Sequence, residues 1–154
     1  MINKFEGQYE FLSNFFPSVI EYGGIQYPTV EHAFQAAKSL SEEEQAAISI
    51  AKTPGIAKRL GRKVVLRPDW EEVKIEVMRQ CLAKKFEHPD LCAKLLATGD
   101  EELIEGNHWH DNFWGSCSCE KCGGNGQNQL GKLLMKIRNE YMEVINSLNK
   151  IPLD

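Results

Sequence analysis

Residues 18–38 read SVIEYGGIQYPTVEHAFQAAK, and this stretch indicates the fold class. In its first half, β-forming residues lie on both sides of the Gly23-Gly24 pair. Glycines can adopt the positive φ angles of a tight turn, so a short β-hairpin is expected there. Thr29, directly after a proline, is typical of a helix start. Apolar residues then recur at helical spacing and predict a helix with one buried face, made of Val30, Ala33, Phe34 and Ala37.

Helix signals continue through the rest of the chain. Ser41 with Glu44 three residues later is a capping-box pattern, and Thr53-Pro54 is an N-cap followed by proline at the first helical position. Asp69 is expected to open a longer helix, whose buried stripe would be Trp70, Val73, Val77, Cys81 and Leu82. A short helix over 89–97 and a long amphipathic helix over 130–148 should follow, the last one closing the core. The chain therefore reads as an α+β fold, mostly helical with a small N-terminal β-hairpin.

Length and composition indicate one globular domain. Of 154 residues, 42% are hydrophobic and 26% charged, so a single domain over residues 1–150 is expected. The net charge of -4 argues against a protein that coats a phosphate backbone, since such proteins carry a broad excess of Lys and Arg. Five cysteines without a secretion signal are typical of a reducing compartment, and no apolar run is long enough to span a membrane. We expect a cytoplasmic protein with no membrane partner, and the sequence leaves its oligomeric state open.

Polar side chains form a second stripe on the first helix. At about 100° per residue, Glu31, Gln35 and Lys38 fall beside the apolar face, at the edge of the core. A carboxylate, an amide and an amine in that position suit a catalytic site. The alternative is an ordinary solvated helix face, with Glu31 stabilised in the first turn by the helix dipole.

The segment 105–129 has no hydrophobic period and is rich in Gly, Asn, His, Trp and Cys, which is typical of a functional or metal-pinned loop. Its string WHDNFWG places Trp109 and Trp114 around the carboxylate of Asp111. Two indoles and one acid suit a partly dry pocket in which a planar heterocycle stacks. The alternative is that both tryptophans fill the core and Asp111 caps a turn.

The same segment carries three thiols in the string CSCEKC, at Cys117, Cys119 and Cys122. Three close thiolates and one histidine can complete a tetrahedral zinc site, with His110 as the preferred fourth ligand and His108 as the other candidate. A site closed by four protein ligands would be structural and would hold the loop. The alternative is a set of free surface thiols, because this spacing is not a common zinc-finger spacing.

Five motifs resemble, in order and spacing, those of the YbiA-like or NADAR family. They are FLSNFFP at 11–17, YPTVEHAFQAAK at 27–38, RLGR at 59–62, WHDNFWG at 109–115 and GQNQLGKLLMKIR at 126–138. The resemblance covers nearly the whole chain and implies an α+β, mostly helical fold. It also implies an N-glycosidase. One branch of the family hydrolyses ribosylamino-pyrimidine phosphates early in riboflavin synthesis, and another removes ADP-ribose from guanine bases in nucleic acid.

Carried over by motif, the resemblance implies roles for eight residues. Glu31 and Lys38 are the leading catalytic candidates, and Asp111 is a further catalytic carboxylate. Five residues would grip the sugar, the phosphate or the base: Asn14, Phe15, Arg62, Trp114 and Asn128. The CSCEKC string, by contrast, is found in only part of the family.

The implied reaction is hydrolysis of the bond between C1' of a phosphorylated ribose and a heterocycle nitrogen. This chemistry requires no metal or organic cofactor, so a zinc ion would be structural only. The expected partner is a small-molecule nucleotide-ribose substrate or an ADP-ribosylated nucleic acid. The alternative function is a binding module that recognises ADP-ribose or a nucleotide without turning it over.

Overall fold

The computed structural model describes residues 1–152, and its residue contacts form two compact units. The central unit runs from Ser13 to His88. The terminal unit combines Met1–Leu12 with the chain from Pro89 onward. The boundaries of the single domain expected from the sequence, residues 1–150, stay a prediction.

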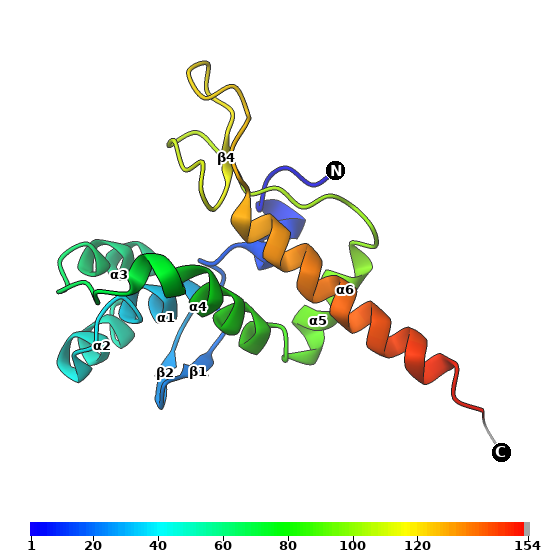
Figure 1. Ribbon diagram of the computed structural model, residues 1–154, viewed down its shortest axis with the longest axis horizontal. Helices are drawn as coiled ribbons and strands as arrows, with labels where there is room; N and C mark the ends of the chain where they lie inside the picture. Colours follow the sequence, from blue (N-terminus) through cyan, green and yellow to red (C-terminus); the bar gives the residue numbers. More distant parts are fainter. Residues whose placement is uncertain (153–154) are drawn as a thin grey trace. The chain divides into compact units, whose positions relative to one another are not determined.

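The central unit consists of a hairpin and four helices (Figure 1). Strands β1 (Ile20–Tyr22) and β2 (Ile25–Tyr27) pair antiparallel around Gly23 and Gly24, whose φ angles are 60° and 86°. The helices are α1 (Val30–Ala36), α2 (Glu42–Ser49), α3 (Pro54–Gly61) and α4 (Trp70–Lys85). Helix α1 contacts the hairpin and the other three helices, and all its residues are buried. Polar side chains on α1 are therefore held in packed surroundings.

Side-chain caps begin the three short helices of this unit where the sequence predicts them. Three hydroxyls each accept the backbone N–H three residues further on, those of Thr29, Ser41 and Thr53. Asp69 precedes α4 as predicted but does not cap it with its side chain. Instead, Arg67 donates to both oxygens of that carboxylate, at 2.6 and 3.1 Å.

The terminal unit is built around one long helix. Its elements are the 3-10 helix η1 (Gly7–Leu12), α5 (Pro89–Ala97), the parallel pair β3 (Gly106–Asn107) and β4 (Ser116–Cys117), and α6 (Gln129–Asn149). Helix α5 lies beside α6 (Figure 1). The loop before α6 is anchored to the start of that helix, because the carbonyls of Phe113 and Trp114 accept the N–H groups of Gln129 and Leu130.

The predicted fold class is confirmed, since about half of the chain is helical and a small antiparallel hairpin lies near the N-terminus. Helix α6 closes the core only in its first half: the stripe is buried as far as Ile137, whereas Val144 and Leu148 are 57% and 60% exposed. At 1.5 Å per residue, α5 is less than half as long as α6 and cannot cover all of it. In the predicted stripe of α4, Val73 is only half-buried. Among the described residues, we find no helix with the length and apolar character that crossing a membrane requires.

Candidate active site

The residues predicted to be functional fall into two groups, one in each unit. The central unit holds Asn14, Phe15, Glu31, Lys38 and Arg62, and the terminal unit holds Asp111, Trp114, Asn128 and the cysteine cluster. In the central unit, α1 and α3 pack together, which joins the polar stripe of α1 to the RLGR motif. In the terminal unit, one loop carries both the WHDNFWG string and the thiols.

Glu31 is a buried carboxylate in the first turn of α1. Its side chain is 7% exposed, and its Oε1 accepts a hydrogen bond from Gln35 Nε2 at 2.8 Å. A spacing of four residues places the amide one helical turn from the carboxylate, so the contact follows from the helix itself. The backbone N–H of Glu31 donates to the carbonyl of Asn14 at 3.1 Å, which ties the SNF segment to the start of α1. The carboxylate is thus oriented by Gln35 on a rigid support.

The Gln35 side chain packs against Gly61 of α3. A Cβ atom added at Gly61 would lie 2.0 Å from Gln35 Oε1, so only glycine permits this contact. Gln35 Oε1 is buried and accepts no hydrogen bond from the described residues. A buried acceptor without a donor costs about 1–3 kcal/mol. The unsatisfied acceptor therefore lowers the stability of the folded protein, while the same amide donates to Glu31.

Lys38 lies just beyond the C-terminal end of α1 and is half-buried. Burial lowers the pKa of its amine, the negative charge of Glu31 opposes that shift, and the cations Arg62 and Lys58 add to it. Burial has the largest effect, so the pKa falls below its ordinary value. A lysine with a lowered pKa has a larger neutral and nucleophilic fraction near neutral pH. The structure thus gives Lys38 surroundings that suit a nucleophile.

The remaining candidates of the central unit differ in exposure. Asn14 is buried, with Nδ2 3.5 Å from Sδ of Met78, and its Oδ1 accepts no hydrogen bond from the described residues. Phe15 is 44% exposed, and Arg62, the C-cap of α3, is exposed as well. A carboxamide oxygen without a donor, an exposed ring and an exposed guanidinium are groups that a ligand can engage.

Asp111 caps a turn in the loop of the terminal unit. Its Oδ1 accepts the backbone N–H of Phe113 at 3.1 Å and that of Trp114 at 3.0 Å. Asn107 holds the backbone of Asp111 on both sides, donating to its carbonyl at 2.8 Å and accepting its N–H at 3.1 Å. The turn-capping alternative is therefore realised. A catalytic role for Asp111 would use its second carboxylate oxygen, Oδ2.

The two tryptophans of the WHDNFWG string are not core residues. Trp109 is 63% exposed and Trp114 is half-buried. The ring of Phe113 meets that of Trp114 edge-on, with centroids 4.8 Å apart and an interplanar angle of 88°. The core-filling alternative fits neither indole. A partly exposed indole held by a neighbouring ring suits stacking on a planar heterocycle.

Asn128 connects backbone segments immediately before α6. Its Oδ1 accepts the N–H of Glu105 at 3.0 Å, and its Nδ2 donates to the carbonyl of Leu103 at 2.8 Å. The residue is buried and has a φ of 51°. Because both ends of the amide bind backbone, a structural role explains these contacts. A substrate contact for Asn128 stays a prediction.

The three thiols of CSCEKC converge on one histidine. The ligand atoms of Cys117, Cys119, Cys122 and His110 all lie within 4.8 Å of one another. His108 lies apart from this group, with its Nδ1 3.3 Å from the hydroxyl of Ser118. The structure therefore selects His110 over His108 and shows a cluster able to hold a metal ion.

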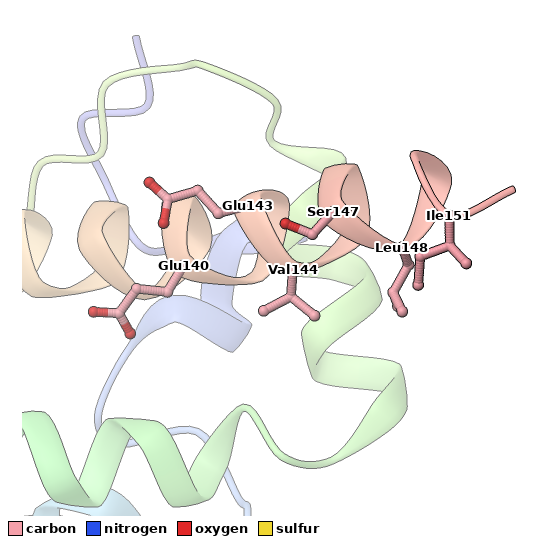
Figure 2. Close-up of a pocket in the computed structure, with 6 residues that line it drawn as sticks. All are labelled: Glu140, Glu143, Val144, Ser147, Leu148 and Ile151. Atoms are coloured by element: carbon pink, nitrogen blue, oxygen red, sulfur yellow. The ribbon is translucent and has the colours of Figure 1, made fainter.

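Two surface hollows are lined by other residues. One runs along the last turns of α6, where Val144, Leu148 and Ile151 line it together with Glu140, Glu143 and Ser147 (Figure 2). The loop with Asp111 joins the opposite end of α6, so this hollow is separate from that candidate group. The second hollow lies in the central unit and is lined by residues 39–41, 44 and 65–68. Neither hollow is lined by a residue predicted to be functional.

Lys85 is a titratable residue that the sequence analysis missed. It is fully buried in the last turn of α4, and burial lowers its pKa to about 7. Its Nζ donates to the carbonyl of Ser13 at 2.8 Å and lies 5.7 and 5.3 Å from the ring centroids of Phe16 and Phe86. A lysine at the end of a helix usually interacts with the helix dipole in solvent, so its position in the sequence gave no signal. Its contact with Ser13 supports the segment that carries Asn14.

Comparison with known proteins agrees with the five motifs. The NADAR domain family matches residues 2–142. An N-glycosidase of Nostoc punctiforme is 41% identical over 146 residues, which cover 90% of this chain and 89% of that protein. The N-glycosidase YbiA of Escherichia coli is 42% identical over 131 residues, or 83% of this chain and 79% of YbiA. A riboflavin biosynthesis protein of Vibrio vulnificus is 39% identical over 86% of this chain, but only over 36% of its own length.

A solved structure supports the same conclusion. The NMR structure of Escherichia coli YbiA matches with a TM-score of 0.80 and 37% identity, covering 99% of this chain and 92% of that one. The fold and the relatives define an enzyme of the N-glycosidase class. The chain belongs to the NADAR family, as the motifs predicted.

Proposed function

We propose that this enzyme hydrolyses the C1'–N bond between a phosphorylated ribose and a heterocycle. The main support is the arrangement on α1, where a buried carboxylate is oriented by an amide and followed by a half-buried lysine. The riboflavin biosynthesis relative favours a ribosylamino-pyrimidine phosphate as substrate. ADP-ribosyl-guanine in nucleic acid is the second substrate class, because it presents the same bond on the same kind of sugar.

Glu31 is assigned the role of stabilising the positive charge that develops on the reacting sugar. Departure of the base leaves positive charge at C1', and a carboxylate fixed in a poorly solvated place stabilises that charge more than an exposed one does. Gln35 keeps the carboxylate in one orientation through the 2.8 Å hydrogen bond. The leaving nitrogen also needs a proton, and Asp111 is the candidate acid, or the base for the attacking water. No metal or organic cofactor takes part in these steps.

Lys38 has two alternative roles. As a neutral amine, its Nζ forms a bond to C1' while the bond to the heterocycle breaks, and the opened sugar then becomes a Schiff base that water hydrolyses. As a protonated amine, it interacts with Glu31 and binds a substrate phosphate together with Arg62. The lowered pKa of Lys38 favours the first role, and the opposing charge of Glu31 favours the second.

Borohydride trapping separates the two roles of Lys38. Borohydride added during turnover reduces a Schiff base to a stable amine, so the peptide that contains Lys38 would gain the mass of the sugar portion. An adduct on that peptide supports attack by the lysine. No adduct, together with appreciable activity in Lys38→Arg, would favour direct attack by water.

Product analysis tests the proposed reaction itself. The purified enzyme is incubated with a ribosylamino-pyrimidine phosphate and, separately, with ADP-ribosylated guanine in an oligonucleotide, and free base and sugar are measured by mass spectrometry. Multiple turnovers on either substrate support the proposal. Binding of both substrates without release of base would contradict it and would identify a binding module instead.

A further inference from the structure

We propose that Cys117, Cys119, Cys122 and His110 bind one zinc ion, which holds the loop between β3 and α6 in its folded shape. The proposed zinc site is structural and lies outside the glycosidase reaction. The zinc site would explain the cysteine-rich loop, which has no role in the polar stripe of α1 or in the bond cleavage.

The first argument is the spacing of the ligand atoms. With zinc–sulfur bonds of about 2.3 Å and zinc–nitrogen bonds of about 2.0 Å, a tetrahedral site places the nitrogen about 3.5 Å from each sulfur. His110 Nδ1 lies 3.7 Å from Cys117 Sγ, 3.4 Å from Cys119 Sγ and 3.3 Å from Cys122 Sγ. These distances lie on both sides of the expected value. The four ligand atoms, which all lie within 4.8 Å of one another, are therefore close enough together to bind one ion.

The second argument is the backbone around the thiols. The N–H groups of Cys122 and Gly123 donate to the carbonyl of Cys119, and the N–H of Gly124 donates to the carbonyl of Cys117. Ser116 and Cys117 form strand β4, so the first thiol is fixed in the β3–β4 pair. A tight turn thus presents Cys119 and Cys122 to a thiol on a fixed strand.

The third argument is the conformation of His110. Its φ is 67°, and a residue other than glycine in this left-handed region stores about 1–3 kcal/mol of strain. The strain is not needed to bury the side chain, because His110 is exposed. In this conformation, Nδ1 lies near all three sulfur atoms. Binding of the zinc ion would offset the cost of the backbone conformation.

The fourth argument is that the loop lacks an apolar core. Within residues 105–128, the buried residues are Asn107, Gly115, Ser116, Cys117 and Asn128. A segment of this length that buries almost no apolar side chains needs another source of folding energy, and a structural metal ion supplies it. Four protein ligands leave no position for a water molecule or a substrate, which is the pattern of structural rather than catalytic zinc.

Metal analysis of paired variants tests the proposal. The protein is purified with reductant but without chelator or added metal, and zinc and iron per chain are measured by mass spectrometry. We expect about one zinc per chain in the wild type, and loss of most of it in Cys119→Ser and His110→Ala. The matched controls are Cys92→Ser, a cysteine outside the cluster, and His108→Ala, the neighbouring histidine that bonds Ser118. Both controls should keep the wild-type zinc content.

Cobalt binding gives a second readout that does not require any variant to fold. Wild-type protein stripped of metal is titrated with Co²⁺, and a tetrahedral thiolate site should give visible bands and thiolate charge-transfer bands that saturate at one equivalent. Added zinc should abolish them. Less than a tenth of an equivalent of zinc in fresh protein, iron in place of zinc, or no cobalt–thiolate bands would overturn the proposal. Equal zinc loss in Cys92→Ser and Cys119→Ser would overturn the assignment of the ligands.

Discussion

Helix α1 and the loop before α6 carry their chemical groups in different ways. Helix α1 is buried throughout and packs on every other element of the central unit, so Glu31 and Gln35 are held by core packing. The loop before α6 buries little. Asp111 is held there by two hydrogen bonds between its backbone and the Asn107 side chain, and by the N–H groups of Phe113 and Trp114, which donate to its Oδ1. A well-packed helix tolerates loss of one polar contact, whereas a loop without an apolar core depends on each of its local contacts. The two regions should therefore respond differently to mutation.

The largest effects are expected from the two carboxylates. We predict that Glu31→Gln and Asp111→Asn each lower turnover by about two orders of magnitude or more, the usual scale for a lost catalytic acid or base. Both substitutions keep an oxygen that can accept the existing hydrogen bonds, so the fold should be preserved. Base release measures turnover, and thermal melting followed by circular dichroism measures stability. The control is Glu43→Gln, an exposed glutamate on α2. Near-normal activity in both folded variants would remove these residues from the mechanism.

Metal removal should separate stability from activity in the loop. We predict that a chelator lowers the melting temperature by about 5 °C or more, because a structural ion contributes to folding directly. The initial rate, measured well below the melting temperature, should fall by a smaller factor because no step uses the ion. Added zinc should restore the melting temperature. A rate that disappears while the melting temperature is unchanged would instead indicate a catalytic metal.

Packing around α1 is tested at Gly61. A Cβ atom there would meet Gln35 Oε1 at 2.0 Å, so Gly61→Ala should destabilise the protein by about 1–3 kcal/mol and displace the amide that orients Glu31. The matched control on the same helix is Gly55→Ala, whose Cβ would meet only Thr53 Oγ1 at 3.8 Å. Urea unfolding and turnover are measured for both. If the two variants behave alike, the close approach at Gly61 does not position Gln35.

The sequence predicted the hairpin and α1 better than it predicted the details of the loop before α6. The hairpin, the cap at Thr29 and the buried face of α1 follow from turn residues, capping and period, which are local properties. The burial of Gln35 against Gly61 depends on α3, which is distant in the sequence. The polar stripe of α1 alone could therefore not show whether its side chains face solvent. In the loop, spacing alone left His108 and His110 as alternatives, because the choice depends on the backbone turn at His110. Strands of two residues such as β3 and β4 are too short to produce a period.

The smallest expected effect concerns Lys85, whose titration tests the packing of the central unit specifically. Its pKa falls from an ordinary value of 10.5 to about 7 because of burial, with no charged group contributing. Between these two values Lys85 binds a proton in the unfolded chain but not in the folded one, so its contribution makes the free energy of unfolding rise with pH. Below pH 7 the folded protein carries a buried charge, and the full penalty applies.

In Lys85→Met this rise should shrink by on the order of 1–3 kcal/mol between pH 7 and pH 9.5. Urea unfolding at several pH values measures the slope. The range ends below pH 10 because burial raises the pKa of Tyr27 to about 12, and its titration in the unfolded chain then lowers stability as pH rises. The control is Lys84→Met, the half-buried neighbour that pairs with Glu21, which should keep the wild-type slope. An unchanged slope in Lys85→Met would mean that Lys85 stays protonated in the folded protein and that its surroundings are more polar than the packing shows.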